Sequence, residues 1–121
     1  MLVFVLICGL LAVLYGVWTS RSILSLDTGN NKMQEIALAI QEGAKAYLNR
    51  QYKTISIVGI IIFFIVWYFL GILSSVGFLI GAILSGLTGY VGMNVSVRSN
   101  VRTAQASTVS LSNGLSVAFK A

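Results

Sequence analysis

The most constraining feature of the sequence is a run without any charged side chain, which extends from Thr54 to Val97. The first charges on either side, Lys53 and Arg98, are both basic. The run is 44 residues long, and because a bilayer core of about 30 Å takes about 20 apolar residues per helix, it predicts two crossings rather than one. Two crossings return the chain to the side it left. Both basic ends then lie on one face, which the positive-inside rule predicts to be cytoplasmic.

The composition supports a membrane protein. Only 9% of the residues are charged and 57% are hydrophobic, whereas soluble domains carry about 25% charged residues. Too few polar side chains are present to coat a soluble domain, so the lipid bilayer is the expected partner. The net charge of +5 is better explained by basic anchors at helix ends than by nucleic acid, because no basic patch alternates with aromatic residues.

The whole chain is predicted to be an all-α, multi-pass helix bundle with three full spans and the start of a fourth. The N-terminus is expected outside, as a retained helix rather than a signal peptide, because no basic residue precedes Arg21. The predicted segments are transmembrane helix 1 at 1–20, a cytoplasmic segment at 21–53, transmembrane helix 2 at 54–70, an outer turn at 71–75, transmembrane helix 3 at 76–97, a cytoplasmic helix end and loop at 98–110, and a truncated transmembrane helix 4 at 111–121.

The cytoplasmic segment contains an amphipathic helix, predicted at 32–50, whose apolar residues recur at helical spacing. Asn31 is the expected N-cap, with Gln34 completing a pair that resembles a capping box. Since the chain has no proline, residues 32–70 are predicted to form a single helix of about 58 Å. We favour a helix that protrudes from the membrane over one that lies on its surface, because its polar face mixes acids and bases.

Two stripes of small residues predict surfaces where helices pack closely in lipid. One lies in the third span and the other follows it, and a glycine-lined ligand or ion pathway is the less favoured interpretation of the first. The helix-packing residues are Gly77, Gly81, Ser85 and Gly89, followed by Ala106, Ser110, Gly114 and Ala118.

The residues point to no catalytic, cofactor-binding or metal-binding site. The chain has no histidine and a single cysteine, Cys8, and the uncharged spans hold no ionisable residue of the kind that ion pathways use. Glu35 and Glu42 share a helix face, which we interpret as solvated rather than as a cation site. Arg98 and Arg102, four residues apart, are interpreted as interface anchors that pair with neighbours, in preference to a site for a phosphate or an anionic lipid.

Three stretches of the sequence resemble the N-terminal region of the membrane-bound, pyrophosphate-energised ion pumps, above all the bacterial proton-pumping pyrophosphatases. They occur in the family's order around the predicted hairpin. The stretches are Gly29–Ala37 with Ile40–Tyr52, then Gly89–Arg98, then Asn100–Ala106. The first span is similar in character only.

The resemblance implies a large helix bundle that works as a homodimer, hydrolyses pyrophosphate with magnesium at a cytoplasmic site and moves protons or sodium outward across the cell (inner) membrane. The family's magnesium, pyrophosphate and gate motifs match no position here. We therefore expect this chain to be an N-terminal fragment that supplies scaffold, packs on the remaining helices and is inactive alone. A small multi-pass assembly subunit without catalysis is the alternative, and a transporter of another substrate is a third hypothesis.

Overall fold

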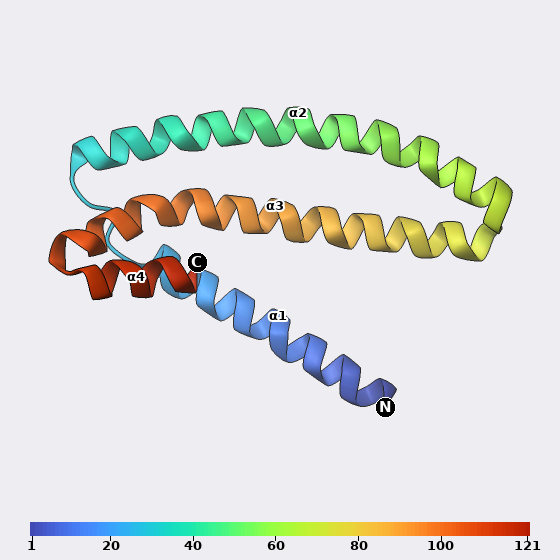
Figure 1. Ribbon diagram of the computed structural model, residues 1–121, viewed down its shortest axis with the longest axis horizontal. Helices are drawn as coiled ribbons and strands as arrows, with labels where there is room; N and C mark the ends of the chain where they lie inside the picture. The colour runs from blue at the N-terminus through green and yellow to red at the C-terminus, as the bar shows by residue number, and fades with distance from the viewer. The chain divides into compact units, whose positions relative to one another are not determined.

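The computed structural model describes residues 1–121 and consists of four α-helices without strands. They are α1 (Leu2–Leu24), α2 (Asn31–Leu70), α3 (Ile72–Val109) and α4 (Leu111–Lys120) (Figure 1). The predicted all-α fold is confirmed. α1, α2 and α3 are each long and apolar enough to cross a membrane.

The chain divides into two compact units, which we call the hairpin unit (Ile40–Asn94) and the terminal unit (Met1–Ala39 with Val95–Ala121). The hairpin unit contains the apolar parts of α2 and α3. The terminal unit contains α1, the first residues of α2, the last residues of α3, and α4. Each unit is described by itself below.

α2 confirms the prediction of one continuous helix. Its 40 residues correspond to about 60 Å at 1.5 Å per residue, twice the thickness of a bilayer core of about 30 Å. The amphipathic stretch and the second span are thus parts of a single continuous helix. Helix propensity is uninterrupted across their junction, since neither proline nor a glycine pair occurs there.

The helix cap is one residue earlier than the sequence predicted. Asn30, not Asn31, accepts the hydrogen bond from the Met33 backbone N–H through its Oδ1, at 2.9 Å. Gln34 Nε2 donates to the Gly29 carbonyl at 3.0 Å, whereas a capping box would return to the backbone of the cap residue. Gly29 has φ +83°, in the left-handed region. This conformation directly precedes the helix and leaves Asn30 in the capping position.

The connection between α2 and α3 is much shorter than the turn expected at 71–75. Gly71 alone separates the two helices, with φ +84°, a conformation that glycine adopts without steric cost. The Gly71 N–H donates to the Trp67 carbonyl at 3.1 Å and the Ser75 N–H donates to the Gly71 carbonyl at 3.2 Å. A one-residue reversal keeps these backbone groups paired, which matters where water is scarce.

α3 continues beyond the predicted span and reaches Val109, so the region 98–110 is helical except for Ser110. Ser110 is extended, with φ −162° and ψ 156°, and its hydroxyl accepts from the Asn113 N–H at 3.1 Å as the N-cap of α4. Within the terminal unit α4 then packs against α1. Likewise, α1 extends past residue 20 to Leu24.

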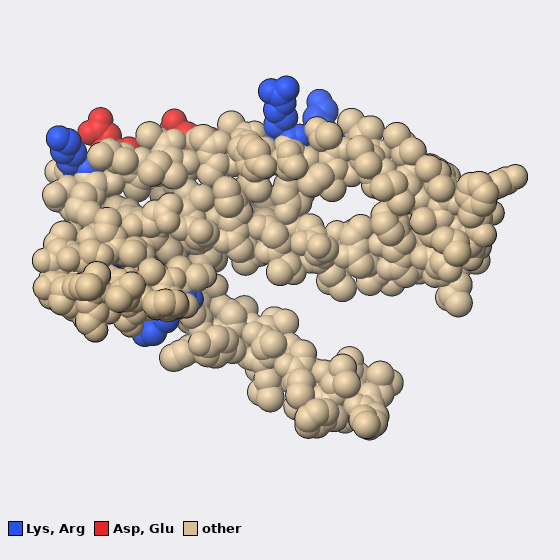
Figure 2. Space-filling view, in the orientation of Figure 1, with Lys and Arg blue, Asp and Glu red and all other residues tan.

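Most large apolar side chains are exposed. Those of α1 are exposed along almost its whole length from Leu2 to Trp18, and Figure 2 shows a surface on which charged side chains are few. A chain with this much exposed apolar surface suits a lipid environment or further packing partners. The buried hydrophobic residues are Ile23, Ala37, Leu48, Val97, Val101 and Val117.

Candidate functional site

In the hairpin unit, one tyrosine joins the two long helices. Tyr52 of α2 is partly buried, and its hydroxyl donates to the Gly86 carbonyl of α3 at 2.6 Å. Its ring also meets the ring of Tyr90 edge to face, with centroids 5.9 Å apart and an interplanar angle of 86°. Such aromatic pairs add about 0.5–1.5 kcal/mol beyond the area that they bury. We call Tyr52, Gly86, Gly89 and Tyr90 the tyrosine contact.

Two glycines make room for this tyrosine. A Cβ atom added at Gly89 would lie 3.0 Å from the Tyr52 hydroxyl oxygen, and one added at Gly86 would lie 3.5 Å from a ring carbon of Tyr52. In contrast, a Cβ atom at Gly77 or Gly81 would meet nothing within 4 Å. All four residues of the first predicted stripe are exposed. Among its glycines, Gly89 lies beside Tyr52, whereas Gly77 and Gly81 have open space beside them.

The second predicted stripe does not lie on one helix, because α3 ends at Val109 and α4 begins at Leu111. Ala106 is half-buried on α3, Ser110 caps α4, and Ala118 is exposed. Gly114 is buried, and a Cβ atom there would overlap the Ser107 side chain. The close approach at Gly114 thus lets α4 fold back over the end of α3.

In the terminal unit, polar side chains hold the end of α1 to the end of α3. Arg102 Nη2 donates to the carbonyl of Leu24, the last residue of α1, at 2.9 Å. A cation at this position satisfies an orphan carbonyl and interacts favourably with the helix dipole. The prediction that Arg102 pairs with neighbours is confirmed, while Arg98 is exposed.

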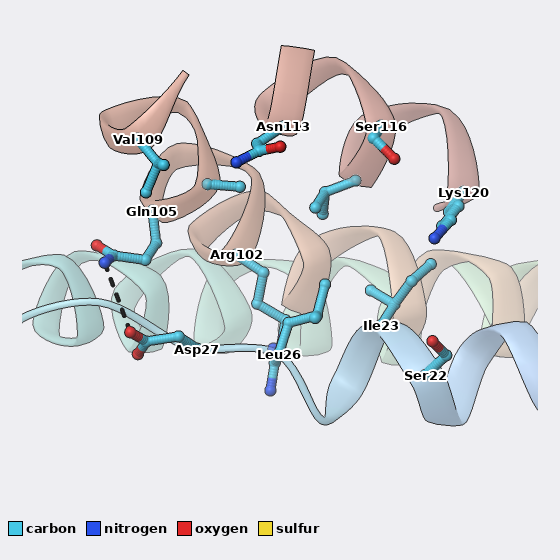
Figure 3. Close-up of a pocket in the computed structure, with 12 residues that line it drawn as sticks. Ser22, Ile23, Leu26, Asp27, Arg102, Gln105, Val109, Asn113, Ser116 and Lys120 are labelled. Carbon is cyan, nitrogen blue, oxygen red and sulfur yellow. Dashed lines mark hydrogen bonds between the residues drawn. The ribbon is translucent and has the colours of Figure 1, made fainter. Parts of the chain in front are cut away.

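A second polar contact lies beside the first. Gln105 Nε2 donates to Asp27 Oδ2 at 3.5 Å (Figure 3), and Asp27 Oδ1 accepts from the Gly29 N–H at 3.0 Å. Two buried polar atoms of this unit, Thr19 Oγ1 and Arg102 Nε, have no hydrogen-bond partner. No group of three or more His, Cys, Asp or Glu side chains is positioned to hold a metal ion.

Sequence reasoning missed Tyr52 and Gly86 as packing residues. One signal was available, since Ala44, Leu48 and Tyr52 follow each other at four-residue spacing on α2, so Tyr52 continues the apolar stripe of the amphipathic helix. The partner glycines on α3 carry no comparable signal, because its apolar half holds five glycines between Gly77 and Gly92 and only three-dimensional contact distinguishes one from another.

The three long apolar helices define the class: this is a multi-pass membrane protein. Residues 10–121 match the family described as inorganic H+ pyrophosphatase. The chain belongs to this family.

Curated relatives agree with this membership. The chain is 44% identical over 116 residues to the K(+)-insensitive pyrophosphate-energized proton pump of Methanosarcina mazei, with 94% of this chain and 17% of that protein covered. It is 43% identical over 117 residues to the K(+)-insensitive pyrophosphate-energized proton pump 2 of Moorella thermoacetica, with 93% of this chain and 17% of that protein covered.

A third relative, from Clostridium tetani, is 37% identical over 118 residues, with 98% of this chain and 18% of that protein covered. This relative carries the provisional name K(+)-stimulated pyrophosphate-energized sodium pump. The chain therefore spans less than one fifth of the length of these relatives. No solved structure matches the chain significantly.

Proposed function

We propose that these residues form the N-terminal part of a pump that couples pyrophosphate hydrolysis to outward transport of protons or sodium. The observation that supports this most strongly is the family match across residues 10–121, which includes all of the long α2–α3 hairpin. The relatives named above are pyrophosphate-energized pumps, and their shared name is the basis for the substrate.

The role of this part is scaffold. Its described contacts are a tyrosine against glycines, an arginine on a helix end and a glutamine on a carboxylate, and each of these positions helices rather than reacting groups. The exposed apolar surface of α1 and the exposed small residues of α3 provide area for the other helices of a larger bundle. Magnesium and pyrophosphate would then bind residues outside this chain.

The orientation, membrane and assembly belong to the same proposal. Five of the eight basic residues lie in the segment from Arg21 to Lys53, and none lies in or near the α2–α3 turn at Gly71. This distribution favours a cytoplasmic position for the α1–α2 connection and an N-terminus outside. The membrane would be the cell (inner) membrane and the active pump a homodimer.

The test uses inside-out membrane vesicles from a host that expresses either the full-length protein or the 121 residues alone. With pyrophosphate and Mg²⁺, the full-length protein should release phosphate and acidify the vesicle lumen, and a protonophore should abolish the acidification. Chelation of Mg²⁺ should stop both activities. The 121 residues alone should do neither.

Two outcomes would contradict the proposal. Hydrolysis by the 121 residues alone would place the chemistry within this chain. A full-length protein without pyrophosphatase activity would support the assembly subunit or a transporter of another substrate. Pyrophosphate-dependent uptake of sodium in place of protons would retain the pump and identify its ion.

A further inference from the structure

The terminal unit contains a pocket of ≈ 340 Å³ between the end of α1, the end of α3 and α4 (Figure 3). One side of it is apolar: Leu26 is exposed there, and Ile23 and Val117 are buried. Lys120 and Arg102 also line it, together with Asp27. The pocket thus combines an apolar wall with two cations and one carboxylate.

Two cations and one carboxylate give the pocket a net positive charge. Asp27 accepts from the Gly29 N–H through Oδ1 and from Gln105 through Oδ2. Arg102 uses both terminal nitrogens on backbone carbonyls, but its buried Nε has no partner. A buried donor without an acceptor is unfavourable, and Lys120 is exposed on the last turn of α4. The charge of the pocket therefore favours an anion as its ligand.

The position of the pocket along α1 indicates where in the bilayer it lies. Residues 1–20 are uncharged, Arg21 is the first charged residue, and the pocket begins at Ser22. The end of a span with its first cation is expected at the level of the lipid headgroups. A ligand at this level that needs both an anion and an apolar body is a phospholipid.

We propose that this pocket binds one anionic phospholipid, with the phosphate and headgroup facing Lys120 and Arg102 and the glycerol and first methylenes against the exposed Leu26. A bound lipid would connect α1, α3 and α4 at the membrane surface. Inorganic phosphate or pyrophosphate would satisfy the cations but leave the apolar wall without a partner. The lipid site does not depend on pump activity, because binding there needs only the charges and the apolar side chains of this pocket.

The test is native mass spectrometry of the full-length protein in detergent, titrated with phosphatidylglycerol or phosphatidylcholine. Lys120→Gln should weaken phosphatidylglycerol binding about fivefold, the effect of one basic residue near an anionic surface. The matched control is Lys45→Gln, an exposed lysine on α2 outside the pocket, which should leave binding unchanged. Ser116→Phe, from an exposed position on the pocket wall, should exclude the lipid while both cations remain.

Three results would overturn the proposal: equal binding of phosphatidylcholine, equal loss in Lys120→Gln and Lys45→Gln, or displacement of the lipid by millimolar phosphate or pyrophosphate. Unchanged binding in a folded Ser116→Phe variant would place the lipid elsewhere. These readouts count bound lipids and need no enzyme activity, so failure here is distinguishable from failure of the pump assay.

Discussion

The tyrosine contact permits a quantitative test of how the hairpin unit is held together. Tyr52→Phe removes the 2.6 Å hydrogen bond to the Gly86 carbonyl but keeps the edge-to-face ring pair with Tyr90. Hydrogen bonds between membrane helices are worth about 0.6 kcal/mol on average and up to about 1.7 kcal/mol. This bond is short and partly buried, so we expect Tyr52→Phe to lower the free energy of unfolding by about 1 kcal/mol.

Gly89→Ala tests the same contact from the other helix. The new Cβ would lie 3.0 Å from the Tyr52 hydroxyl oxygen, so the hydroxyl must shift by a few tenths of an ångström, and we expect its hydrogen bond to weaken. Gly81→Ala is the matched control, because it is also within α3 and its Cβ would meet nothing within 4 Å. Relative to this control, Gly89→Ala should cost about 1 kcal/mol, the same bond lost a second way.

The double mutant carries the decisive information. In Tyr52→Phe the oxygen that the new Cβ would meet is gone, so adding Gly89→Ala should cost much less than it does in the wild-type protein. We expect a coupling free energy of about 0.5–1 kcal/mol, within the range for residues in contact. Reversible unfolding of the full-length protein in mixed dodecylmaltoside and SDS micelles, followed by circular dichroism, measures it. Additive effects, or a Gly81→Ala variant as costly as Gly89→Ala, would refute the reasoning.

Two further predictions concern the start of α2. Asn30→Ala should lower the free energy of unfolding by about 0.5–2 kcal/mol because it removes the cap of the helix, whereas Asn31→Ala should change it by less than about 0.5 kcal/mol. The same unfolding assay measures both variants. A larger loss for Asn31→Ala would show that Asn31 is the cap, as the sequence predicted. Gly29→Ala should lower the free energy of unfolding by at least about 1 kcal/mol, since Gly29 has φ +83° and the new Cβ would lie 2.7 Å from Met33 Sδ. The control is Gly43→Ala, inside α2, whose new Cβ would meet nothing within 4 Å. This control should be neutral or stabilising. Equal melting temperatures for Gly29→Ala and Gly43→Ala would show that the turn tolerates a side chain.

Different parts of the chain were predictable to different degrees. The continuous α2 was predictable because no proline interrupts it, and this signal acts locally, residue by residue. The length of the α2–α3 turn was not, since the stretch from Gly71 to Ser75 has a loop-like composition and its helical state depends on pairing every backbone group near lipid. The Asn30 and Asn31 alternatives differ by one residue, and the left-handed Gly29 decides between them.

The packing residues show the same division. Small residues at four-residue spacing predicted close approach along α3, and Gly89 lies beside the Tyr52 hydroxyl, whereas Gly77 and Gly81 have no neighbour within 4 Å. Which glycines are used depends on where a bulky side chain of another helix lies, and Tyr52 selects Gly86 and Gly89. The stripe from Ala106 to Ala118 failed as one surface because Ser110 leaves the helical conformation, a break that spacing alone does not reveal.

The sequence by itself determined that this chain is a membrane protein, how many long apolar helices it has and to which family it is similar. These properties follow from hydropathy, charge distribution and local propensity, which are sums over neighbouring residues. Only the tertiary structure decided the tyrosine contact, the Arg102 bond to the end of α1 and the pocket beside it. Each of these joins residues 34 or more positions apart, and such contacts depend on the geometry of two helices at once. The uncharged run from Thr54 to Val97 thus predicted that two helices cross the membrane, and the placement of Tyr52 determines how they hold each other.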